Sequence, residues 1–167
     1  MNKEIEFVAI DLETTGKYPL SAEICEVALI RFNSQKILKT FTTLVKPLKG
    51  MSKIAQSIHG LSLEDLSDAP NIKDVLKDIS DFINGASLVG HNVPFDLGFL
   101  VFEIEKHVPE LIEAFKAPHF CTSLLSLSLY PKLTSHRLKH LTKFFGISEA
   151  PDHRALQDAQ ACRLVFL

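Results

Sequence analysis

Residues 7–13 read FVAIDLE and combine an apolar, β-branched run with two carboxylates. Such a run predicts a strand, in which successive side chains point to opposite faces of a sheet. Asp11 and Glu13 lie two positions apart, so both are expected on one face, where neighbouring carboxylates repel unless a cation lies between them. This stretch therefore predicts a strand that carries part of a cation site.

The rest of the chain has the pattern of an α/β fold. The first strand is expected over residues 5–12, and two more over 22–32 and 36–45, where the short gaps favour an antiparallel meander. Short strands are predicted at 86–89 and 119–121. Helices are predicted over 71–84, from Phe95, from Thr122, over 138–145 and after Pro151. The sequence ends inside this last helix, which fits a domain trimmed from a longer protein.

Length and composition favour one domain over residues 1–167. A chain of 167 residues, 46% of them hydrophobic, buries roughly 70% of its unfolded surface without help from disulfides. No repeat or long linker divides it. Its apolar runs are too short to cross a bilayer, and the early charges Lys3 and Glu4 do not fit a secretory signal, so we expect a cytoplasmic protein with no membrane association. The three cysteines form no Cys-x-x-Cys pair, which fits a reducing compartment.

Two further carboxylates interrupt apolar segments. Asp96 is the only charged residue between Val93 and Phe102, and burying it without a partner would cost several kcal/mol. Asp158 lies among alanines in the last helix. Four converging carboxylates would suit two divalent ions, Mg²⁺ or Mn²⁺, better than zinc. A pair of ions about 3.5 to 4 Å apart can activate water against a phosphodiester.

Hydrolysis also needs a general base, for which His153 is the candidate because imidazole titrates near neutral pH. His153 precedes Asp158 by five positions, and two helical residues with that spacing would not share a face. We therefore expect His153 in the loop or cap that follows Pro151, from which its side chain could reach the site.

Each of these residues also has an ordinary structural interpretation. Asp11 and Glu13 would be a strand-end pair that forms simple salt bridges, and Asp96 would cap its own helix. Asp158 would pair on the helix surface with Arg154 or Arg163, and His153 would be an exposed loop residue.

Three segments together resemble the motifs of the DEDD (DnaQ-like) 3′–5′ exonuclease superfamily. They are residues 10–16 (IDLETTG), 89–96 (VGHNVPFD) and 153–159 (HRALQDA), in the order that the superfamily shows. The resemblance implies a ribonuclease H-like mixed five-stranded sheet flanked by helices. It also implies that Asp11, Glu13, Asp96 and Asp158 hold two metal ions and that His153 is the base.

The histidine five positions before the last aspartate resembles the His-containing branch of the superfamily, because the Tyr branch would need a tyrosine where Arg154 stands. Within that branch the chain is most similar to the proofreading (epsilon) subunit of bacterial DNA polymerase III, through residues 14–16, 58–61 and 69–70. This resemblance implies that the terminal nucleotide's site is lined by Leu12, Thr14, His59 and Phe95, although packing would explain His59 and Phe95 as well.

The implied activity is metal-dependent 3′–5′ hydrolysis of single-stranded or frayed DNA, which releases nucleoside 5′-monophosphates in proofreading or repair. A DNA polymerase subunit is a candidate partner. Two alternatives remain: a ribonuclease that trims RNA 3′ ends, and a non-catalytic module that binds 3′ ends beside a polymerase.

The distribution of charge suggests how nucleic acid would approach. The net charge of −2 by itself disfavours a polyanion binder, but assigning four acids to two divalent ions makes the loaded protein positive by about 2. Residues 131–143 carry only basic charges and are either a solvated helix face or a track for the phosphate backbone. Residues 61–81 hold six acids against two lysines and are expected to face away from nucleic acid.

Overall fold

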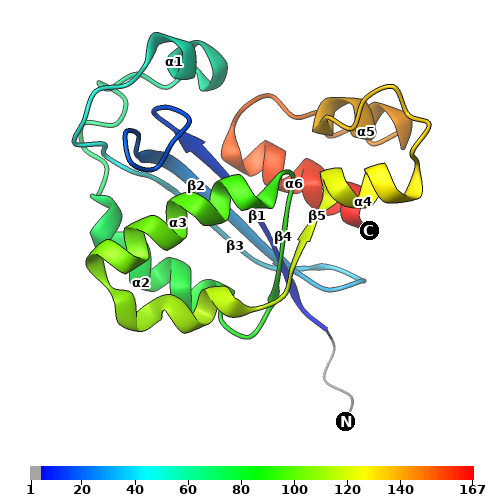
Figure 1. Cartoon of the computed structure of the whole chain (residues 1–167), viewed down its shortest axis with the longest axis horizontal. Coiled ribbons are helices and arrows are strands. Elements are labelled where there is room, and N and C mark those ends of the chain that lie inside the picture. The colour runs from blue at the N-terminus through cyan, green and yellow to red at the C-terminus, as the bar shows by residue number, and fades with distance from the viewer. Residues whose placement is uncertain (1–4) are drawn as a thin grey trace.

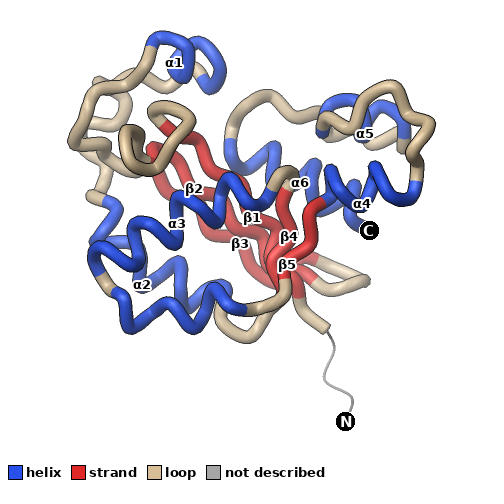
Figure 2. The backbone as a smooth tube through the Cα atoms, in the orientation of Figure 1, coloured by secondary structure: helices blue, strands red, loops and turns tan. Residues whose placement is uncertain are grey.

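The computed structural model describes residues 5–167, so Lys3 and Glu4 lie outside the described residues. One mixed sheet runs through the molecule in the order β3-β2-β1-β4-β5. Strands β1 (Phe7–Thr14), β2 (Ile24–Phe32) and β3 (Ile37–Leu44) form the antiparallel meander that the short gaps predicted. Strands β4 (Ser87–Gly90) and β5 (His119–Cys121) add in parallel on the other side of β1 (Figure 2). The predicted α/β class with a mixed five-stranded sheet is confirmed.

Helices cover both faces of this sheet (Figure 1). On one face lie α2 (Ile72–Ile83) and α3 (Val93–His107), and on the other lies α6 (Ala155–Phe166). Next to α6 are α4 (Thr122–Leu129) and α5 (Leu138–Phe144), while α1 (Lys53–His59) lies near the end of β1. None of the helices in the described part of the chain has the length and apolarity that crossing a membrane requires.

The alternation along β1 decides which residues belong to which face. Val8, Ile10 and Leu12 pack with α2 and α3 in the larger core, whereas Ala9 packs with α6 in the smaller one. Asp11 and Glu13 continue the Ala9 series, so the strand's period of two directs both carboxylates toward α6. The face that the sequence predicted for this pair is thus the face covered by the last helix.

Two elements were not predicted. Helix α1 begins after Ser52, whose Oγ accepts a hydrogen bond from the Ala55 N–H at 3.0 Å, and ends at Gly60 with φ of 77°. A 3₁₀ segment, η1 (Pro109–Lys116), follows α3. Both are short, and α1 shows its cap residues more clearly than any apolar periodicity, which explains why pattern analysis missed it.

The three cysteines form no disulfide, as their spacing predicted. All three are free thiols; Cys25 and Cys162 are buried and Cys121 is half-buried.

Candidate active site

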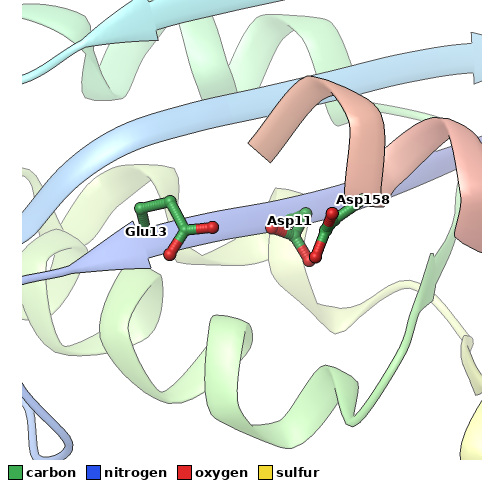
Figure 3. Close-up of side chains that lie close together, drawn as sticks. All are labelled: Asp11, Glu13 and Asp158. Atoms are coloured by element: carbon green, nitrogen blue, oxygen red, sulfur yellow. The ribbon is translucent and has the colours of Figure 1, made fainter. Parts of the chain in front are cut away.

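Three acidic side chains meet where β1 passes beneath the first turn of α6. Asp11 and Glu13 come from β1 and Asp158 comes from α6, and one oxygen of each lies within 4.8 Å of the others. Figure 3 shows the three carboxylates turned toward a common space between the strand and the helix. Among residues 5–167 no ion pair involves any of the three, so a strand-end salt bridge for Asp11 and Glu13 is not what the structure shows.

Asp96 lies beside this cluster without being a member of it. The residue is 4% exposed in the first turn of α3, and its Oδ1 accepts a hydrogen bond from the Leu12 N–H at 3.0 Å. Strand β4 pairs with β1 only as far as Ala9, so the N–H of Leu12 has no strand partner on that side. The Asp96 carboxylate therefore supplies the hydrogen-bond acceptor that the Leu12 N–H lacks at this edge of β1. The N-cap of α3 is Asn92, and the Asp96 carboxylate also accepts from its own N–H in the first turn, so its role combines a local helix contact with the link to β1.

Burial and mutual repulsion make these carboxyls weak acids. Burial, followed by the charges of Asp96, Asp158 and Glu13, raises the pKa of Asp11 well above its ordinary value. Burial and the charge of Asp158 raise the pKa of Glu13 to about 8. Burial also raises the pKa of Asp96 to about 8, against the hydrogen bonds from its own N–H and that of Leu12. Clustered oxygen donors that repel one another in this way fit a hard divalent cation.

We expect the stability of the metal-free protein to decline as the pH rises. Between the unfolded pKa of 4.5 and the folded pKa of about 8 for Glu13, the folded state holds a proton that the unfolded chain has released, so stability falls across this interval. Melting temperatures measured in chelator across this pH range should fall, and added Mg²⁺ should raise the value most at the alkaline end. A metal-free protein that is most stable at the alkaline end would contradict this expectation.

His153 lies in the loop directly before α6, as the spacing to Asp158 predicted. Its φ is 61°, one of two positive values at non-glycine residues in the described chain. The N–H groups of Asp152 and His153 donate to Asp158 Oδ1 at 3.0 and 3.3 Å. The turn thus holds Asp158 through its backbone and leaves the side chain of His153 exposed at the edge of the site. The arginine pairing considered for Asp158 does not occur.

The structure reveals an ion pair between buried Glu26 and partly exposed Arg154 that was not predicted. Glu26, on β2, lies opposite Glu13 in the antiparallel register and is 8% exposed. Arg154 donates to both of its oxygens, from Nη2 at 2.7 Å and from Nε at 3.1 Å, and the Ala155 N–H donates at 3.1 Å. Glu26 therefore anchors the start of α6 to the sheet, and the charge of Arg154 offsets part of the negative charge beside Glu13. An acid inside the apolar stretch 24–32 is the same signal that identified Asp96.

Replacing Arg154 by methionine should lower the free energy of unfolding by about 1–3 kcal/mol, because Glu26 would remain buried and charged without its partner. Adding Glu26→Gln to that variant should recover most of the loss, since the remaining buried group is neutral. Urea unfolding of the two variants is compared with that of Arg163→Met. The Nε of Arg163 donates to Gln160 Oε1 on the same helix, and its guanidinium lies 5.8 Å from the centre of the Phe32 ring, so it has no acidic partner to leave unpaired. An equal loss in Arg163→Met would show that the Glu26 contact is not responsible.

The four residues expected around the terminal nucleotide line one hollow beside the acidic cluster. Leu12, Thr14, His59 and Phe95, together with Glu13, contribute to a space of about 400 Å³ between the end of β1, α1 and α3. Phe95 is half-buried and its ring lies 5.1 Å from that of Phe99. The structure thus brings these side chains together at the end of the strand that carries the carboxylates.

His59 also has a clear packing role. It is 5% exposed, its Nδ1 accepts a hydrogen bond from the Leu61 N–H at 3.1 Å, and its Nε2 lies 3.9 Å from Cys25 Sγ. Burial lowers the pKa of His59, which keeps the ring neutral. A fixed, uncharged imidazole is suited to form a wall of the hollow.

Solved structures of similar shape include exonuclease I. A structure described as suggesting how processivity is achieved in that enzyme superposes with a TM-score of 0.84 over 95% of this chain and 39% of the other, at 21% identity. The complex of E. coli exonuclease I with a dA16 oligonucleotide gives 0.80 over 95% of this chain and 39% of the other, at 22% identity. At these identities the likeness concerns the fold.

Curated relatives with higher identity are DNA polymerase III chains of the PolC type. The chain is 34% identical over 164 residues to that of Caldanaerobacter subterraneus subsp. tengcongensis and 33% identical over 165 residues to that of Bacillus subtilis. These matches cover 98% and 99% of this chain but 11% of each relative. The epsilon subunit is not one of these two relatives, so the epsilon resemblance stays a prediction.

The family comparison covers nearly the whole chain. Residues 8–166 match the family model RNase_T, described as exonuclease. This span runs from the start of β1 to the end of α6 and includes all three motifs. The chain belongs to the exonuclease (RNase_T) family.

Proposed function

We propose that residues 1–167 act as one 3′–5′ exonuclease domain that hydrolyses single-stranded or frayed DNA ends and releases nucleoside 5′-monophosphates. The observation that carries this proposal is the meeting of Asp11, Glu13 and Asp158 beside a hollow large enough for a nucleotide. An acidic cluster alone is common on proteins. A cluster that adjoins a partly apolar hollow and a loop histidine is suited to holding and cleaving a terminal nucleotide.

Asp11, Glu13 and Asp158 would hold divalent cations, Mg²⁺ or Mn²⁺, with Asp96 as the fourth carboxylate of a two-ion site. Such ions supply Lewis acidity and stabilise negative charge on a phosphodiester. Without a cation the cluster offers no positive charge to a phosphate, so we expect no binding of a 3′ end at this site in chelator.

The residues of the chain itself have distinct parts in the proposed reaction. The walls formed by Leu12, Thr14, His59 and Phe95 would receive the terminal sugar and base, and the Phe95 ring tolerates any base because every base has a π-face. His153, at the edge of the site, would accept a proton from the attacking water. The ion pair between Glu26 and Arg154 fixes the position of the His153 turn, and with it Asp158, relative to β1.

The relatives suggest a setting for this activity. Both relatives reported above are named DNA polymerase III PolC-type, which makes a role beside a replicative polymerase in the bacterial cytoplasm, in proofreading or repair, our favoured proposal.

Product analysis tests the proposal most directly. DNA and RNA oligomers blocked at either the 3′ or the 5′ end are incubated with the protein and Mg²⁺, and the products are identified by mass spectrometry. We expect 5′-monophosphates from DNA with a free 3′ end and none from 3′-blocked DNA. Faster release from RNA would favour the ribonuclease alternative, and binding without turnover, even in Mn²⁺, would favour the non-catalytic module.

A further inference from the structure

We infer that a surface formed by α4, α5 and the loop between them binds the single strand upstream of its 3′ end, as an extension of the proposed exonuclease site. This basic-aromatic surface consists of Lys132, Arg137, Lys139, Lys143, Tyr130, Phe144 and Phe145. All seven side chains are exposed, and none of them contributes to the acidic cluster or to the hollow beside it.

The charge of this surface is not compensated within the chain. Residues 117–148 contain no Asp or Glu, and no ion pair in residues 5–167 involves its four cations. Two lysines of other segments have acidic partners: Lys77 pairs with Asp81 at 2.5 Å, and Lys116 pairs with Glu113. The surface therefore lies in a stretch of sequence that carries basic charges alone.

The spacing of the two lysines in α5 destabilises this helix. Lys139 and Lys143 lie at positions i and i+4 of α5, and like charges at this spacing destabilise a helix by about 0.2–0.5 kcal/mol. An acid at either position would relieve the repulsion. A pair of phosphates bound outside the helix would relieve it as well.

Aromatic side chains supply the second half of the surface. A hollow of about 400 Å³ is lined by Leu129, Tyr130, Pro131, Lys132, Leu133 and Phe144. Tyr130 and Phe144 are 42% and 49% exposed, with ring centres 5.6 Å apart. Exposed rings beside spaced cations are the usual means of binding single-stranded nucleic acid without sequence preference, because bases stack while lysines contact phosphates. A single strand presents phosphates and bases in alternation, which matches cations set beside a stacking hollow.

The basic-aromatic surface lies beside α6, the helix that carries Asp158. Helix α5 runs alongside α6: Leu138 shares a buried cluster with Ala155 and Ala159, and Phe145 lines a small pocket with Val165 and Phe166 (Figure 1). The seven residues of α5 rise about 10 Å. A strand that leaves the acidic cluster past the start of α6 would therefore pass Arg137 and Lys139 before it reaches the hollow.

The test separates binding from chemistry. In the variant Lys132→Gln/Lys139→Gln/Lys143→Gln, we expect the Kd for a labelled oligothymidylate of about 16 nucleotides, measured by fluorescence anisotropy in Ca²⁺, to rise about tenfold or more. The slope of log Kd against log salt concentration should fall by about 2, as three lost phosphate contacts predict. Hydrolysis of the p-nitrophenyl ester of thymidine 5′-monophosphate, which is too short to reach α5, should stay within about twofold of the parent.

A matched control carries the same charge change elsewhere. Lys36, Lys39 and Lys73 are exposed on the β2–β3 hairpin and α2, and their triple glutamine variant should bind the oligomer as the parent does. The inference is overturned if the Lys132→Gln/Lys139→Gln/Lys143→Gln variant keeps the parent's Kd, which is the result expected of a surface that binds an acidic protein instead. It is also overturned if ester hydrolysis falls in parallel with oligomer binding. A parent that binds the oligomer but hydrolyses nothing would refute the proposed function, and the comparison of Kd values would still decide the role of this surface.

Discussion

Asp11→Asn should reduce the rate of 3′-end hydrolysis by about 10³-fold or more, because metal-ion catalysis contributes several kcal/mol to stabilisation of the transition state. Asparagine keeps the shape of the side chain and removes one charge from the cluster of Asp11, Glu13 and Asp158. The same change should weaken Mn²⁺ binding measured by calorimetry. It should leave the metal-free protein at least as stable as the parent, since burial and neighbouring acids raise the pKa of Asp11 and make its charged form unfavourable.

The combination of lost activity and retained stability distinguishes a ligand from a structural residue. Asp78→Asn, on the exposed side of α2, is a suitable control and should behave as the parent in both assays. If Asp11→Asn digests a 3′-labelled oligonucleotide in Mg²⁺ as fast as the parent, the metal assignment is wrong.

His153→Asn should lower the hydrolysis rate by about 10² to 10⁴-fold while Mn²⁺ binding is largely kept, as expected when a general base is removed. Asparagine is the appropriate replacement because it tolerates the positive φ of 61° at this position better than alanine does. The N–H groups that donate to Asp158 Oδ1 belong to the backbone, so they survive the substitution.

The two assays together assign the role of His153. Loss of Mn²⁺ binding in His153→Asn would make the residue a metal ligand, and an unchanged rate would exclude it from the reaction. His119→Asn, an exposed substitution on β5, controls for the general effect of losing an imidazole.

Local patterns predicted most of the fold. The antiparallel meander and the helix over α2 follow from side-chain periodicity and turn residues. Helix α1 was missed because its signals are the caps Ser52 and Gly60 rather than an apolar stripe. The buried Glu26 was not predicted although it interrupts an apolar strand, because its partner Arg154 is 128 positions away in the sequence.

For this protein the sequence by itself determined that Asp11 and Glu13 share a face of β1, that His153 precedes its helix, and that Asp96 and Asp158 interrupt apolar segments. These features follow from the periodicity of side-chain directions over a few neighbouring residues. Only the tertiary structure decided which acids meet. Asp96 binds the N–H of Leu12, 84 positions away, and Arg154 binds Glu26, 128 positions away. Such contacts depend on where β4 stops pairing with β1 and on how α6 crosses the sheet, and packing between distant elements sets both.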